Sequence, residues 1–154
     1  MTEELKLYPR WKQAVQDLLL AGLTYGSRVE KSQLIDLCGL QLPTTIEEKD
    51  KFDLQLLNCI SEIKDELLTQ HRMLLATNND GSYRVVRPED QTAYVIDKGA
   101  RALAKELQRM ATGVQFVNAE LLTDEQRKRN ADAQAKVGLL AGMQRAGMRE
   151  VQTA

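Results

Sequence analysis

The sequence predicts a mostly helical α+β protein with one β-hairpin. Three observations predict this fold class: apolar residues recur at helical spacing, an Asn/Asp/Gly turn separates two short apolar runs, and a later segment keeps an apolar period of about 3.5 residues. The chain has 154 residues, 43% of them hydrophobic and 28% charged, which is enough for one domain or slightly more. We expect an N-terminal domain at 1–87, a helical region at 88–147 and a flexible tail at 148–154.

Three helices are predicted in the first half of the chain. The first covers about residues 9–23, with a proline in its first turn, and the second covers about 29–37 and stops at Gly39. Residues 41–51 predict a loop that enters another helix near Glu47, where acidic residues suit the positive end of the helix. The apolar pattern of this third helix covers about residues 52–72. Four apolar residues recur along that helix for about five turns, which predicts its buried face: Leu56, Ile60, Ile63 and Leu67.

The apolar period changes after the third helix. Residues 73–86 form two short apolar runs around Asn78, Asn79, Asp80 and Gly81, which predicts a β-hairpin. A long helix then begins at a proline and acidic residues and continues to about residue 121. A last helix is expected from about residue 124 to 145.

The long helix carries an apolar seam with alternating spacings of four and three residues. Two copies of the chain could pair through this seam as a twofold dimer, or the helix could fold back on the last helix as an antiparallel hairpin. The length of the seam favours self-association. The predicted oligomerisation residues are Ile96, Leu103, Leu107, Met110, Val114 and Val117.

Three helices followed by a hairpin resemble a winged helix-turn-helix domain. The segments that carry this resemblance are RWKQAVQDLLLAG, KSQLIDLCGL, LQLLNCISEIKDELL and MLLATNNDGSYRVV, which together cover about residues 8–87. Small phage-encoded proteins and bacterial regulators often have this order. The resemblance implies that the third helix enters the DNA major groove while the hairpin, the wing, touches the backbone or the minor groove.

Carried over by position, the resemblance implicates polar residues on the third helix and on the wing. These residues are Lys51, Gln55, Asn58, Asn78, Asn79 and Arg84. The same region is acidic, however, because residues 1–86 carry 10 basic and 13 acidic side chains, whereas 87–154 carry 11 and 9. The acidic charge therefore weakens the expectation that the third helix reads bases.

A basic row in the long helix is the second candidate nucleic-acid site. Lys98, Arg101, Lys105 and Arg109 are spaced by three, four and four residues, so they share one helix face that could follow a phosphate backbone. The competing interpretation is a solvated face of a packed helix, since Asp97 and Glu106 dilute the positive charge.

Several other functions are not expected from the sequence. One histidine and two cysteines 21 positions apart make no zinc motif, and the chain has neither a phosphate-binding glycine loop nor a GxSxG serine motif. We expect no enzyme activity, no metal and no cofactor, and both cysteines are expected to be small buried hydrophobes. Short apolar runs and the acidic start MTEELK argue against a membrane span or a signal peptide, so a cytoplasmic location is expected, in the bacterial host if the protein is phage-encoded.

The leading functional interpretation is an oligomeric, non-enzymatic DNA-binding protein, for example a phage or bacterial transcription regulator or replication accessory. An alternative is an adaptor or inhibitor that engages a basic protein through the acidic third helix, at Glu62, Asp65 and Glu66, and the loop 43–53. A third is a structural assembly protein that needs only the apolar seam. DNA and a second copy of the chain are thus the expected partners, with a further protein as the alternative.

Overall fold

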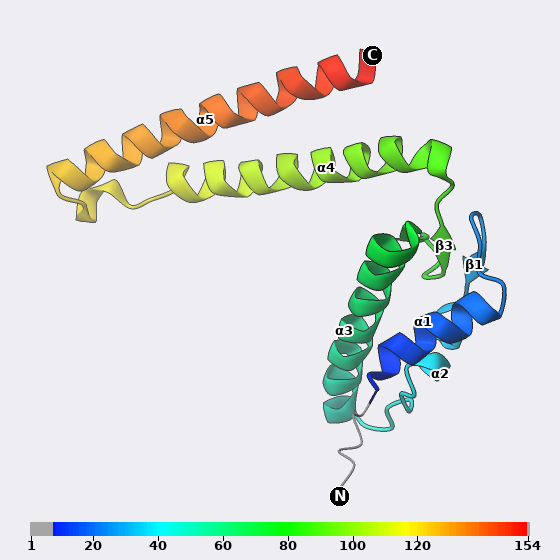
Figure 1. The fold of residues 1–154 in the computed structure, drawn as a ribbon. Helices are drawn as coiled ribbons and strands as arrows, with labels where there is room; N and C mark the ends of the chain where they lie inside the picture. The colour runs from blue at the N-terminus through cyan, green and yellow to red at the C-terminus, as the bar shows by residue number, and fades with distance from the viewer. Residues whose placement is uncertain (1–7, 154) are drawn as a thin grey trace, which may run out of the picture. The chain divides into compact units, whose positions relative to one another are not determined.

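Five helices and a small antiparallel sheet make up residues 8–153, which are the residues that the computed structural model describes (Figure 1). This architecture confirms the prediction of a mostly helical α+β fold. In chain order the elements are α1 (Arg10–Leu20), β1 (Arg28–Val29), α2 (Lys31–Leu37), α3 (Ile46–His71), β2 (Leu75–Thr77), β3 (Tyr83–Val85), α4 (Pro88–Gln115), the 3-10 helix η1 (Ala119–Leu121) and α5 (Asp124–Thr153).

The chain divides after Gln91 into two compact units. The first contains α1 to α3, the sheet and the first turn of α4, and the second contains the rest of α4 and α5. We describe each unit by itself.

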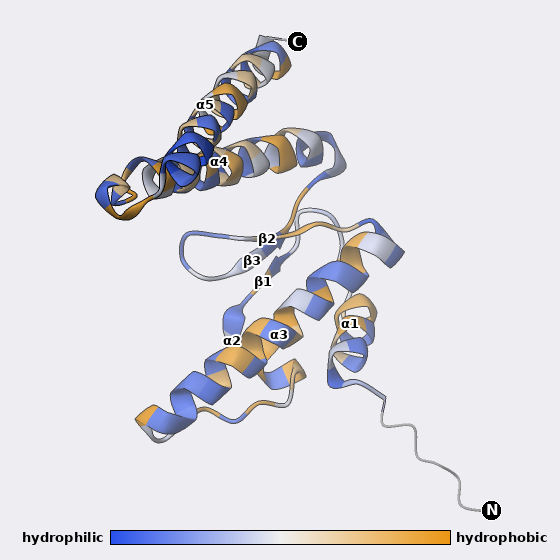
Figure 2. Cartoon of the chain, turned by 90° about the vertical axis from the view of Figure 1, so that its left-hand side faces the viewer, coloured by the Kyte–Doolittle hydropathy of each residue, from blue (hydrophilic) through white to orange (hydrophobic). Residues whose placement is uncertain are grey.

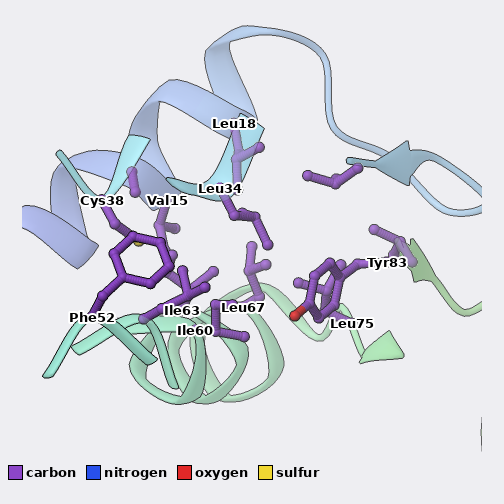
Figure 3. Packing of buried hydrophobic residues seen from close by; sticks show 14 residues of the cluster. Val15, Leu18, Leu34, Cys38, Phe52, Ile60, Ile63, Leu67, Leu75 and Tyr83 are labelled. Atoms are coloured by element: carbon purple, nitrogen blue, oxygen red, sulfur yellow. The ribbon is translucent and has the colours of Figure 1, made fainter. Parts of the chain in front are cut away.

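The first unit has a single core between the helices and one face of the sheet (Figure 3). The expected positions on α3 are buried, and Ile63 and Leu67 are fully inaccessible to solvent. They pack with side chains from the other elements of the unit, among them Val15, Leu18 and Leu34. The interior face of α3 was therefore predictable from helical periodicity alone.

The third helix begins earlier than its apolar pattern predicts. Thr45 caps α3 by accepting a hydrogen bond at 3.2 Å from the backbone N–H of Glu48. The Glu48 carboxylate accepts in turn from the backbone N–H and the hydroxyl of Thr44, at 3.0 and 2.9 Å. This arrangement resembles a capping box, with the Glu48 carboxylate bonded to Thr44 instead of the N-cap N–H, and the helix begins at Ile46, next to the predicted entry near Glu47. The predicted loop 41–51 is correspondingly shorter.

The sheet has three strands, one more than the sequence predicts. β1 pairs with β3, and β2 pairs with β3 on its other side, so the strand order is β1-β3-β2. Gly26, at φ +84°, makes the turn before β1 and donates to the Val85 carbonyl at 2.8 Å. Val29 was expected to begin the second helix, but it is a strand residue in the core because two residues are too few to show a β period.

The two cysteines form a disulfide in the structure, which corrects their expected role as separate buried hydrophobes. Cys38, just after α2, is bonded to Cys59 in the middle of α3, with 6.5 Å between the Cα atoms. Cys38 is buried and Cys59 is partly buried beside the core. The sequence alone did not indicate that these two positions meet across the α2–α3 packing.

The second unit is an antiparallel pair of helices (Figure 1). α4 ends at Gln115 instead of continuing to residue 121, because a turn and η1 intervene before Thr123 begins the next helix. Thr123 and Gln126 cap α5 by exchanging backbone-to-side-chain hydrogen bonds at 2.9 and 3.3 Å. α5 continues to Thr153, so residues 148–153, assigned from the sequence to a flexible tail, are helical. Nowhere in the described part of the chain is a helix both long and apolar enough to cross a membrane.

Candidate nucleic-acid interface

The basic row is the most continuous positive surface among the predicted site residues. Lys98, Arg101, Lys105 and Arg109 all lie in α4 within the second unit, and all four side chains are exposed. At about 100° of rotation per residue, Lys98 and Lys105 lie about 160–180° around the helix from Leu107, which is only 7% exposed. The basic row therefore points away from the side of α4 that packs against α5.

The arginines of the basic row are held only by exposed acidic neighbours. Arg101 lies 3.2 Å from Asp97, and Arg109 lies 3.4 Å from Glu106. The paired side chains are between 57% and 82% exposed, and ion pairs of this kind contribute only about 0–1 kcal/mol. Replacing these carboxylates by phosphate groups as partners of the two arginines would therefore cost little free energy. Lys98 lies with its Nζ 5.8 Å from the centre of the Tyr94 ring.

The predicted site residues of α3 lie on its outer face. Lys51, Gln55 and Asn58 are exposed there, opposite the core. Lys51 and Gln55 also line a groove of about 510 Å³ between α3 and the loop that follows Gly39. The charge of the helix is unfavourable for phosphate, because α3 carries seven acidic and three basic side chains.

Large apolar side chains share this outer face of α3 with the acidic groups. Leu54 is 59% exposed, Leu57 is 65% exposed, and Ile46 at the start of the helix is 86% exposed. Phosphates offer no apolar partner for these side chains, and in the major groove the thymine methyl group is the main apolar one. Sequence periodicity marked Leu57 only as a flank of the core.

The predicted wing residues have three different environments. Asn78 is partly buried because its Nδ2 donates to the Ser82 hydroxyl at 2.9 Å and its backbone N–H donates to the Ser82 carbonyl at 2.7 Å. Asn79 is exposed at the tip of the hairpin. Arg84 is exposed in the central strand, where it stands in register with Arg28 of β1. Of the three, Asn78 has a structural role that ties it to the turn.

Arg28 is a basic residue of this surface that sequence reasoning missed. It lies beside Arg84 on the outer face of the sheet, and its guanidinium contacts Glu30 at 2.6 Å and Asp80 at 2.7 Å. The only sequence signal was its place before Val29, in a strand too short to be recognised. The sheet thus adds two neighbouring arginines, one of which is bridged to two carboxylates.

Asp80 makes the hairpin turn partly acidic. Its carboxylate accepts from the hydroxyl of Ser82 at 2.6 Å and from the Ser82 backbone N–H at 3.0 Å. These hydrogen bonds, followed by the contact with Arg28, lower the pKa of Asp80 to about 2. The carboxylate therefore stays ionised near neutral pH and opposes a phosphate at the tip of the wing.

The predicted oligomerisation residues do not share one environment. Leu107 is buried, and Ile96 and Val114 are partly buried. Leu103 and Met110 remain 49% and 44% exposed. Val117 lies outside α4, in the connection to η1, and is 37% exposed.

Residues 8–153 contain no group of three histidine, cysteine, aspartate or glutamate side chains placed to hold a metal ion. Comparisons with protein-family models, curated proteins and solved structures find no match for the chain.

Proposed function

We propose that this chain is a non-enzymatic nucleic-acid-binding protein with a winged helix-turn-helix N-terminal domain. The order of three helices followed by a hairpin supports the domain assignment, as does the packing of the hairpin against α3 through Lys64, which donates to Thr77 at 3.1 Å. A small phage or bacterial regulator, acting in the cytoplasm, is the kind of protein that this arrangement fits. In a reducing cytoplasm the cysteine pair would be kept as thiols.

The observation that carries the proposal is the exposed basic row of α4. Its four cations lie within residues 98–109, which span about 16 Å of helix, and over this length one DNA strand presents about five phosphates. Contacts of this kind position a protein on nucleic acid without reading its sequence. Binding should therefore be sensitive to salt and tolerant of sequence.

Within this proposal the first unit has a secondary role. The acidic charge of α3 opposes its insertion among phosphates, so Lys51, Gln55 and Asn58 contribute little base reading. Asn79 and Arg84 of the wing are better placed, because both are exposed and neither lies on the acidic helix.

Fluorescence anisotropy of a labelled random duplex, titrated with the full chain at low salt, tests the proposal. The variant Lys98→Gln/Lys105→Gln should weaken binding by about tenfold or more. The variant neutralises two phosphates fewer, so its binding releases fewer counterions from the DNA. Lys128→Gln/Lys136→Gln removes the same charge from α5 and serves as the matched control, with an expected change within about twofold. Equal weakening by both variants, or no binding by the natural sequence, would overturn the assignment to α4.

A second candidate function is docking of a basic protein on the outer face of α3. The exposed Leu54 and Leu57 among acidic residues favour it, since an apolar contact rimmed by carboxylates suits a basic amphipathic segment. On this alternative the duplex titration shows no binding. Leu57→Glu would then remove a co-purifying protein partner, while Lys105→Gln would leave it bound.

A further inference from the structure

The second unit leaves most of its large apolar side chains uncovered. Among residues 92–153, the buried hydrophobic residues are Leu107 and Val137, at 7% and 6% exposure. Isolated helices are marginal in water, and their stability in proteins comes mainly from packing of an apolar face. The large hydrophobic residues of this unit that stay exposed are Val95, Leu103, Met110, Phe116, Val117, Leu121, Leu139, Leu140, Met143 and Val151.

Contacts near the turn fix how the two helices stand side by side. Gln134 of α5 donates to the Val114 carbonyl of α4 at 3.0 Å, and Arg127 donates to the Ala119 carbonyl at 2.9 Å. Val114 and Gln134 are therefore level with each other near the turn of the antiparallel pair. Because both helices rise by about 1.5 Å per residue, Met110 is level with residue 138 and Leu103 with residue 145.

Four of the exposed side chains lie together on one side of this pair. On α4, Leu103 and Met110 are rotated by about 40–60° around the helix axis from buried Leu107. On α5, Leu140 and Met143 are rotated by about 60–120° from buried Val137. Both rotations have the same sense, and in an antiparallel pair this brings the side chains to the same side. We call these four residues the hairpin face; they are between 44% and 61% exposed. Figure 2 shows apolar residues recurring along both helices.

Glycines leave room for a close approach on this side, as Gly138 and Gly142 also do on the other side of α5. Gly99 and Gly113 of α4 and Gly147 of α5 lie on the same side as the hairpin face, and a Cβ added at any of them would meet no atom within 4 Å. Glycine inside a helix costs about 1 kcal/mol relative to alanine. No packing within the chain requires these glycines, so the space beside them is open to a close approach from outside.

We propose that a second copy of this chain covers the hairpin face and forms a four-helix dimer. α4 and α5 are nearly equal in length, 28 and 30 residues, and two such hairpins can pair around a twofold axis. Taking the second unit's part of α4 as about 35 Å long and two helices as about 20 Å wide, the side measures roughly 700 Å². A specific interface buries about 800 Å² per partner, so the available area suits a stable dimer.

This dimer differs from pairing through α4 alone, because α5 supplies half of the contact. Leu140 and Met143 were not among the predicted oligomerisation residues, since the apolar pattern of α5 is broken by polar residues in its first half. The basic row of α4 points away from α5 and is not part of the hairpin face, so it stays accessible in the dimer. The dimer does not depend on nucleic-acid binding.

Sedimentation equilibrium of the full chain at protein concentrations between about 1 and 100 µM tests the proposal. This range detects a dimer whose dissociation constant is micromolar or lower. The natural sequence should show twice the mass of 17.4 kDa. Met110→Glu and Leu140→Glu should each raise the dimer dissociation constant by about a hundredfold or more, because a buried charge has no partner there. Ala131→Glu is the matched control, since Ala131 is exposed on α5 about 180° around the helix from Leu140, and this variant should remain dimeric.

Each other outcome overturns the proposal. A monomer for the natural sequence at 100 µM would exclude the second copy, and a dimer that persists in both glutamate variants would place the interface elsewhere. Dissociation of Ala131→Glu to the same extent would show that the hairpin face is not the contact. Since the glutamate variants could unfold the hairpin, thermal unfolding of the natural sequence is a second measurement, and its midpoint should rise with protein concentration. A concentration-independent midpoint contradicts the dimer.

Discussion

Arg28 and Asp80 are 52 residues apart in sequence, yet the guanidinium Nη2 of Arg28 lies 2.7 Å from the Asp80 carboxylate. This ion pair ties the edge strand β1 to the turn between β2 and β3. Glu30 contacts the same guanidinium at 2.6 Å. The ion pair adds a side-chain contact to the backbone pairing of β1 with β3.

The first prediction concerns the stability of this element at low pH. The pKa of Asp80 is lowered to about 2, so its ionised form stabilises the fold above the unfolded pKa, and this contribution is lost as the pH falls toward 2. Asp80→Asn should therefore be less stable than the natural sequence near pH 6, with the difference closing near pH 2. Urea unfolding at several pH values measures this difference. Asp36→Asn, at an exposed helix position, is the control, and its stability difference from the natural sequence should not close in this way. A stability difference for Asp80→Asn that stays constant with pH would contradict the stabilising role of the ionised carboxylate.

The disulfide gives the second prediction. Cys38 and Cys59 close a loop with a sequence separation of 21, and constraint of the unfolded chain by such a loop is worth about 3 kcal/mol. Cys38→Ala/Cys59→Ala should lower the free energy of unfolding by about this amount relative to the oxidised protein, as measured by urea denaturation. Adding a reductant to the natural sequence should have a similar effect. Free thiols in the purified, air-oxidised protein would contradict the pairing.

The core of the first unit gives the third prediction. Ile63 is completely buried in the middle of α3, so Ile63→Ala should cost about 2–5 kcal/mol through lost burial and the cavity left behind. Leu57→Ala, on the same helix but 65% exposed, should change the free energy of unfolding by about 0.5 kcal/mol or less. Similar losses for the two variants would mean that α3 is rotated about its axis.

The cap of α3 gives the fourth prediction. Thr45→Ala removes the acceptor for the Glu48 N–H and should lower the free energy of unfolding by about 1 kcal/mol. Thr45→Ser keeps the hydroxyl and should retain most of the stability. Equal loss in the serine variant would show that the methyl group, and not the capping hydrogen bond, is responsible.

The sequence predicted those parts of the fold that repeat regularly. The buried positions of α3 follow a helical period over several turns, and the Asn/Asp/Gly turn identifies the hairpin. The two-residue strand β1 could not be found in this way, because its partner is β3, more than 50 residues later. The start of α3 near Glu47 could be predicted from the acidic residues that follow two threonines, although the apolar pattern itself begins only near residue 52.

The surfaces were less predictable than the core. The shared face of the basic row follows from spacing within one helix, so its four residues could be grouped correctly. Whether Leu57 or Leu103 is covered depends on what packs beside the helix, and local sequence does not contain that information. For the same reason the contribution of Leu140 to the hairpin face required the pairing of α4 with α5.

The dependence of duplex affinity on salt tests the central claim most directly. The slope of the logarithm of Kd against the logarithm of salt concentration gives the number of phosphates that the protein neutralises. Each neutralised phosphate contributes about 0.9 to this slope. If the basic row binds nucleic acid, Lys98→Gln/Lys105→Gln should reduce the magnitude of the slope by about 1.8, while Lys128→Gln/Lys136→Gln leaves it unchanged. A slope that is the same in the α4 variant and the natural sequence would contradict a role for the basic row.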